Sequence, residues 1–336
     1  MAAWNNQPGL KAAGVAEMRA NRAAGALVRR RDSPIQAGAD GGFQGGFHVC
    51  LTVRRLAQER NVAIGELLAD GGTAVRWLDQ TERLWGIPQG VGALLDRCFE
   101  RVPAGEAAEF AVAAVEAIPV GADLDQVATR WMLDLLADNE QGVLRHLENG
   151  AAADRVVELY RRKLAGESVP VSEWQAAAQG AHAASAQANA IQQAGVAATG
   201  FAAAFAAAAA YAPDMLPSEV RIAAWRAAVT LADEAAANAY QARYLESEAL
   251  AQAAEYAVNT VEAVADAAFR AVLAPIREAA QRGRAAGPAA SQADAAAAAQ
   301  AQQAAAASRA TCVEYQRWQA RRLVQHLAQA PIGRGQ

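Results

Sequence analysis

The chain has 336 residues, a net charge of −4 and a pI near 5.7, which disfavour a general binder of nucleic acid or of anionic membranes. Hydrophobic residues make up 53% of the chain, but alanine inflates this figure and aromatic residues reach only 6%, so the apolar area per residue is small. The three cysteines lie far apart and form no CxxC motif, which disfavours a zinc knuckle or a disulfide framework and indicates a reducing interior.

Residues 1–46 are predicted to form a flexible basic and glycine-rich arm. Within the first part of this stretch, five arginines are opposed only by Glu17, and paired glycines follow. The glycines are not followed by the Lys-Ser/Thr of a phosphate-binding loop. Because the stretch also has no continuous apolar run typical of a secretion signal, we expect a cytoplasmic location or a place within a phage or bacterial assembly.

Residues 47–165 are predicted to form a domain of short helices. The clearest segment is 91–102, where apolar residues follow the i, i+3, i+4, i+7 spacing of a helix packed on one face. Residues 105–118 and 123–138 continue this pattern across the breaker 119–122, and Trp77, Trp85 and Trp131 are expected to anchor the core. Since no run of alternating β-branched residues occurs, the predicted class is all-α.

Residues 166–280 are predicted to form an alanine-rich antiparallel bundle of long helices. From Trp174 to Pro213, 40 residues contain no Asp, Glu, Lys or Arg, and 21 of them are alanine. One interpretation is that the small side chains let this stretch pack closely and dry against neighbouring helices, since alanine also has the best helix propensity. The alternative is a membrane-inserting hairpin, which the few Leu, Ile, Phe and Val residues make less favourable.

A long helix is expected after the break at 213–220. Residues 218–274 contain no Gly or Pro, so one helix of about 80 Å could form, or two if a turn interrupts it, and Pro275 is expected to end or kink it. Residues 281–309 are predicted to form a low-complexity spacer that is helical in part, and 310–330 a C-terminal amphipathic helix. The large side chains expected at packing or interface positions are Ile191, Phe201, Phe205, Tyr211, Trp225, Tyr240, Tyr244 and Trp318.

The sequence predicts no catalytic, cofactor-binding or metal-ligating residue. The four histidines belong to no Glu-x-x-His, HExxH or zinc-deaminase motif, and no Walker loop or G-x-S-x-G elbow occurs. Glu255, Glu262 and Asp266 share one helix face, which we interpret as solvated rather than as a carboxylate site. We therefore expect no cofactor and favour a non-enzymatic protein, although the sequence leaves enzymatic activity open.

Two turns and a break carry a resemblance to known proteins. They are Gly86-Ile87-Pro88, the Phe99-Glu100 helix end before Pro103, and the segment Ala117-Ile118 through Asp123-Leu124. Together with the alanine-rich region and the closing amphipathic helix, they resemble a family of uncharacterised alanine-rich helical proteins of bacterial and phage genomes. Residues 150–212 are also similar to the Ala/His-rich helices of bacterial immunity-type proteins. The resemblance implies an all-helical fold and supplies no catalytic residue.

The functional hypothesis is a non-enzymatic helical protein that associates with itself or with a protein partner, as a phage or prophage assembly component or an immunity-type binder. No specific nucleic-acid partner is expected. One alternative is a membrane-active protein that inserts residues 174–213. Another is a helical bundle that binds a small molecule or carries out a reaction, with Trp77, Trp85 and Trp131 lining its pocket. A pocket in which carboxylates or histidines converge would favour this last hypothesis.

Overall fold

The computed structural model describes residues 2–32, 35–37, 42–69, 74–146, 151–190, 202–208, 210, 234–284 and 290–333. Across these ranges the fold is all-α, as expected, with one antiparallel pair of two-residue strands. The elements in chain order are η1 (Ala3–Asn6), α1 (Pro8–Ala23), β1 (Gln36–Ala37), β2 (Phe43–Gln44), α2 (Phe47–Arg60), α3 (Ile64–Ala69), α4 (Ala74–Trp85), α5 (Gln89–Arg101), α6 (Ala104–Ala117), α7 (Asp125–Ala137), η2 (Val143–His146), α8 (Ala151–Leu164), α9 (Val171–Ala190), a helix over 202–208, α11 (Glu234–Arg284) and α12 (Ala290–Ala328).

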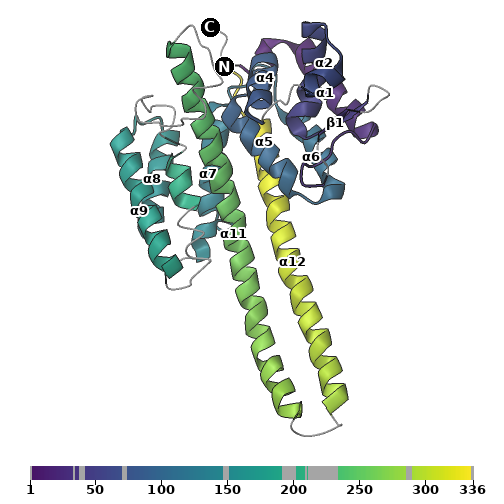
Figure 1. Ribbon diagram of the computed structural model, residues 1–336. Coiled ribbons are helices and arrows are strands. Elements are labelled where there is room, and N and C mark those ends of the chain that lie inside the picture. The colour runs from purple at the N-terminus through teal and green to yellow at the C-terminus, as the bar shows by residue number, and fades with distance from the viewer. Residues whose placement is uncertain are drawn as a thin grey trace.

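The molecule consists of a helical head and a projecting two-helix arm (Figure 1). The head contains the shorter helices together with the first part of α11 and the last part of α12, which run antiparallel. The arm is the rest of this hairpin, which we define as α11 from residue 266 and α12 up to residue 314. None of the described side chains of 266–278 and 296–314 is buried, whereas both helices bury residues inside the head.

The N-terminal segment belongs to the core of the head, so the expected flexible arm is wrong for residues 2–32. The Trp4 side chain is fully buried, and its Nε1–H donates to the carbonyl oxygen of Ile118 at 3.0 Å. Helix α1 packs against α6, and two of its arginines form ion pairs with acidic residues of that helix, Arg19 with Glu116 and Arg22 with Glu109. The basic charge thus has partners about 90 residues away in the sequence, which local composition does not reveal.

Both described ends of the chain are hydrogen-bonded to the turn between α6 and α7. The Ala3 N–H donates to the Ala122 carbonyl at 2.9 Å, and the Asp123 N–H donates to the Pro331 carbonyl at 2.7 Å. Gly121 has a φ of +72°, which favours glycine, and a Cβ there would lie 2.6 Å from Oδ1 of Asn6. This turn, where the sequence predicts a helix break, therefore holds both described ends of the chain on the head.

One continuous core joins the regions that were expected to be separate domains. Helix α11 packs on α5, and α12 packs on α5, α6 and α7, so helices from 47–165, 166–280 and 310–330 share buried contacts. The expected spacer over 281–309 also differs from the structure, because α12 is a single helix from Ala290 to Ala328. Helix α11 does not end at Pro275 but continues to Arg284.

The described parts of the alanine-rich stretch pack against the head, in agreement with the close-packing interpretation. Helix α9 buries Trp174, Ala177 and Ala181 on the face that it turns toward α8. In the helix over 202–208, Ala202, Ala203, Ala206 and Ala207 are fully buried. The Tyr160 hydroxyl of α8 donates to the Ala206 carbonyl at 2.6 Å, and this close approach depends on the small size of alanine.

We predict that Gly86→Ala destabilises the protein more than Gly166→Ala. Both glycines have positive φ values, +67° and +85°, so each substitution carries the cost of a left-handed conformation, about 1 kcal/mol. A Cβ at Gly86 would in addition lie 2.4 Å from the Ala2 carbonyl oxygen, whereas a Cβ at Gly166 would meet nothing within 4 Å. Urea unfolding should show that Gly86→Ala lowers the free energy of unfolding by about 1 kcal/mol or more beyond the effect of Gly166→Ala. Equal losses would contradict the docking of the N-terminal segment on this turn.

Candidate functional site

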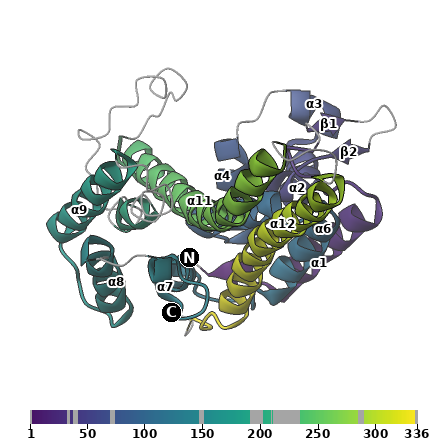
Figure 2. The same ribbon diagram turned by 90° about the horizontal axis from the view of Figure 1, so that it is seen from below.

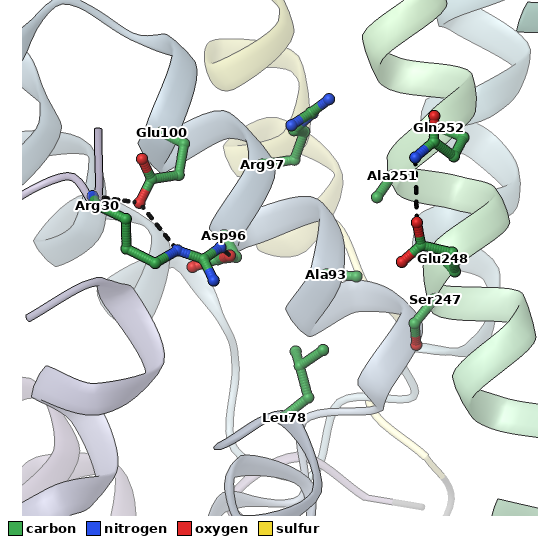
Figure 3. A pocket seen from close by; sticks show the side chains of 10 residues that line it. All are labelled: Arg30, Leu78, Ala93, Asp96, Arg97, Glu100, Ser247, Glu248, Ala251 and Gln252. Atoms are coloured by element: carbon green, nitrogen blue, oxygen red, sulfur yellow. Dashed lines mark hydrogen bonds and ion pairs between the residues drawn. The ribbon is translucent and has the colours of Figure 1, made fainter. Parts of the chain in front are cut away.

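A charged pocket of about 310 Å³ lies between α5, the loop at Arg30 and α11 (Figure 3). Arg30 reaches across from the loop to two carboxylates of α5: its guanidinium pairs with Asp96, and its Nε lies 3.5 Å from Oε1 of Glu100. The backbone N–H of Arg30 also donates to Glu100 at 2.8 Å. On the opposite wall, the Gln252 amide of α11 donates to Glu248 at 3.1 Å. The pocket therefore combines two arginines, Arg30 and Arg97, with three carboxylates.

A second pocket of about 230 Å³ adjoins the first and shares Arg30 and Asp96 with it. It is also lined by His48 and Trp77, both of which are buried. The Nε2–H of His48 donates to the Gly92 carbonyl at 2.9 Å, and Nδ1 lies 3.1 Å from the Thr81 hydroxyl. Burial lowers the pKa of His48, although the nearby Asp96 carboxylate opposes this shift. Burial therefore favours the neutral imidazole, which donates from Nε2 to the Gly92 carbonyl.

Glu255 holds α11 against α5. Its two carboxylate oxygens pair with the guanidinium groups of Arg97 and Arg101, which lie one turn apart on α5. All three side chains are only about a quarter exposed or less. The expectation that Glu255 belongs to a solvated face is therefore wrong, because that face of α11 meets α5 here. Further along α11, Glu262 is exposed and Asp266 is partly exposed, as the solvated-face interpretation expects.

The charged pocket is held together by pairs between its own side chains. Asp96 and Glu100 bind Arg30, and Arg97 binds Glu255 outside the pocket wall, so most of its charges are already compensated within the chain. Within the described ranges, no three His, Cys, Asp or Glu side chains converge in a way that could hold a metal ion. The convergence of carboxylates meets the condition set for the small-molecule hypothesis, and that hypothesis stays a prediction.

A third pocket of about 330 Å³ lies between α9 and the helix over 202–208. It is lined by Gln179 and His182 of α9 and by Phe205, with three alanines completing the wall. The Phe205 ring stacks on Tyr256 of α11, with ring centroids 5.5 Å apart and planes 7° from parallel. This stacking connects the alanine-rich stretch to the long helix.

The predicted packing residues are distributed over different environments. Phe205 is half-buried against Tyr256, and Trp318 is half-buried and stacks on Tyr315 at 5.4 Å, so the structure places both at packing positions. Tyr240 and Tyr244 lie in α11, but the structure does not describe their side chains. Four further predicted residues lie outside the described ranges: Ile191, Phe201, Tyr211 and Trp225.

The three tryptophans proposed to line one pocket lie in three different places. Trp77 lines the second pocket, Trp85 packs edge-on against Trp4 at 5.9 Å, and the Trp131 indole donates to the Gln319 carbonyl of α12 at 3.0 Å. The pocket residues Arg30, Asp96, Arg97 and Glu100 were not identified from the sequence. The sequence does show that Asp96 and Glu100, and likewise Arg97 and Arg101, lie four residues apart and so share a face of α5.

Comparisons of the chain with family models, with curated proteins and with solved structures find no match. The resemblance to alanine-rich helical proteins of bacterial and phage genomes therefore stays a prediction. Within the described part of the chain, no helix combines the length and the apolar character needed to cross a membrane.

We predict that Glu255→Gln lowers the free energy of unfolding by about 1–2 kcal/mol, because it leaves two partly buried guanidinium groups without a charged partner. The matched control is Glu158→Gln, which removes an exposed ion pair with Arg155 on α8 and should change the free energy by less than about 0.5 kcal/mol. Chemical denaturation measures both. An effect of Glu255→Gln as small as that of Glu158→Gln would contradict the role of Glu255 in holding α11 against α5.

We predict that His48 makes the protein less stable in mild acid. Because the pKa of His48 is lowered in the folded state, the unfolded chain binds a proton near pH 6.5 that the folded chain does not bind. Below pH 6.5 the free energy of unfolding should fall by up to about 1.4 kcal/mol per pH unit from this group, until the pH reaches the lowered folded pKa. Urea unfolding from pH 7.5 to 5 measures the free energy of unfolding of the wild type and of His48→Gln. The difference between these two free energies should shrink as the pH falls. A constant difference would show that the folded state does not disfavour the imidazolium.

Proposed function

We propose that this chain is a non-enzymatic helical association protein, in which the head holds the two-helix arm out for docking to helical surfaces of protein. The observation that carries the proposal is the arm itself. A cytoplasmic location, or a place within a phage or bacterial assembly, belongs to this proposal, as does an immunity-type role.

The dimensions of the arm suit docking. Residues 290–314 of α12 extend about 37 Å at 1.5 Å per residue, and α11 accompanies them on one side (Figure 1). Figure 2 shows α11 and α12 side by side from below, and Figure 1 shows that no other described helix reaches the far end of this pair. The described side chains of the arm are not buried, so the arm adds little to the stability of the head. This supports a role for the arm outside the head.

The surface of the arm is made largely of alanine. Exposed alanines occur on both helices, at 267, 268, 271, 274, 296, 298, 299, 306, 307 and 310. Small side chains allow two helices to approach closely, since the distance between helix axes depends on the side chains at the contact. The arm could therefore fit against another helix along its length, in the way that helices bind in apolar grooves.

The seam between the two arm helices pairs large with small side chains. Between residues 296 and 314 of α12, the half-buried positions are Ala297, Ala301, Ala304, Ala305, Ser308, Cys312 and Val313. They follow helical spacing, and all but Val313 are small. These small residues leave the larger side chains of α11 partly uncovered, and Phe269 and Val272 remain half-buried. Partly covered apolar side chains on a projecting element support an interaction surface.

Shortening the arm should abolish association and spare the head. Deletion of residues 266–279 and 297–310 removes two heptads from each helix, so the seam keeps its register. We expect full-length protein to form a complex, with itself or with a co-purifying protein, and the shortened protein to run as a free monomer. Size-exclusion chromatography with light scattering, followed by mass spectrometry of the peak, measures this.

The control variant is Val62→Ser, which changes an exposed apolar residue of the head and should leave association unchanged. Circular dichroism and thermal unfolding check that the shortened head is folded. A full-length protein that is monomeric with nothing bound, or a complex that survives shortening of the arm, would refute the proposal.

A further inference from the structure

Arg30 and Asp96 form the boundary between the charged pocket and the second pocket, because these two side chains line both. The Arg30 guanidinium pairs with Asp96, and its Nε lies 3.5 Å from Oε1 of Glu100 (Figure 3). A rotation of the Arg30 side chain toward solvent would therefore join the two pockets into one cavity. The joined cavity would extend from α11 to the buried side chains of Trp77 and His48.

The two carboxylates are the fixed part of this boundary, and the guanidinium is its replaceable part. Asp96 and Glu100 lie one turn apart on α5, and their side chains are only 19% and 13% exposed. The Arg30 side chain is 45% exposed and comes from a turn between α1 and β1. Its backbone N–H donates separately to Glu100 at 2.8 Å, so the turn keeps a contact with α5 when the side chain moves.

The carboxylates of the charged pocket outnumber the cations available to them. Asp96 and Glu100 share the guanidinium of one arginine, Arg30. On the facing wall, Glu248 is hydrogen-bonded to a neutral amide of α11 at 3.1 Å (Figure 3). The other arginine of the pocket is bound by Glu255. Because partly buried carboxylates without a cation are costly, the pocket is suited to a positively charged ligand and not to an anion.

The second pocket adds an apolar surface beside these carboxylates. Trp77, Val49 and Ile35 line it, and an indole ring can attract a cation over its face. His48 lines it too, and because burial lowers the pKa of this imidazole, His48 is neutral at pH 7 and does not repel a cation. The joined cavity therefore combines a carboxylate pair with a wall that suits the aliphatic part of a ligand.

We propose that the joined pockets bind a small aliphatic cation, whose guanidinium or primary ammonium group replaces the Arg30 guanidinium on Asp96 and Glu100. Arg30 is then a built-in competitor that occupies the carboxylate pair when no ligand is bound. A second positive group on the ligand would be attracted to Glu248 on the facing wall, so a diamine or an aminoalkylguanidine is the preferred class. The site lies in the head, so ligand binding does not depend on the arm.

Isothermal titration calorimetry at low ionic strength tests the site with three probes of similar shape. Agmatine carries a guanidinium and an ammonium group, butylguanidine carries only the guanidinium, and butylurea is the neutral counterpart of butylguanidine. We expect agmatine to bind the wild type with a dissociation constant below about 1 mM, butylguanidine to bind more weakly, and butylurea not to bind. Glu248→Gln should weaken the binding of agmatine about threefold and leave that of butylguanidine unchanged.

Arg30→Ala tests the displacement directly. It removes the competitor, so agmatine should bind about tenfold tighter or more, and loss of folding cannot produce tighter binding. The double variant Asp96→Asn/Glu100→Gln removes the pair that holds the cation and should weaken binding about tenfold or more, with circular dichroism confirming that the helix content is kept. The matched control is Arg22→Ala, which removes an exposed ion pair with Glu109 on α6 and should leave the affinity unchanged.

Three results would overturn the cation site. The first is that neither the wild type nor Arg30→Ala binds agmatine up to about 10 mM. The second is that butylurea binds as tightly as butylguanidine, and the third is that Arg30→Ala does not tighten the binding of agmatine. The protein with the shortened arm should bind agmatine as the full chain does, so a failure of the cation site and a failure of the proposed function give different results.

Discussion

The close approach of alanine methyl groups to larger side chains is the constraint on which this structure depends. An alanine contributes little apolar area, so a core rich in alanine gains stability only when helices come near enough for many small contacts. The fully buried alanines of α11, Ala253 and Ala257, and those of the helix over 202–208 meet this condition. A few large anchors, above all Trp4, Trp131 and Tyr160, supply the area that the alanines do not.

An alanine seam does not by itself define how far one helix slides along another. Successive heptads of small residues look alike, so a shift by seven positions costs little packing energy. Polar contacts with a unique position remove this degeneracy. Glu255 binds two arginines of α5, Arg317 of α12 binds Glu106 of α6 at 3.0 Å, and the Trp131 indole reaches one carbonyl of α12. These contacts occur only in the head, so the head determines the register in which the arm leaves it.

The sequence was informative where the determining contacts are local. Helices α5, α6 and α7 follow from apolar spacing and from Pro88, Pro103 and the turn before Asp125, and the all-α class follows from the same pattern. Local composition predicts a flexible arm for residues 2–32, and this prediction is wrong because their arginines find partners in α5 and α6, which only the fold brings near. The prediction of a solvated Glu255 fails for the same reason. Its spacing on α11 is visible in the sequence, but the packing of α5 against that face is not.

The bounds of the long helices α11 and α12 are hard to predict from the sequence for a different reason. Helix propensity alone is compatible with either a broken or a continuous helix over 290–309, and the half-buried seam of α12 against α11 favours the continuous helix. Pro275 removes one backbone hydrogen bond, yet α11 continues past it to Arg284. The charged pocket lies where three distant segments meet, and no single motif marks it.

The turn over 119–124 has a mechanical consequence. Because the segments around Ala3 and Pro331 are both bonded to this turn, tension applied between them would pass through a few backbone hydrogen bonds and not along the long helices. The arm projects away from the end of the molecule where these segments lie (Figure 1). It would therefore remain outside the load path when these two segments are pulled apart.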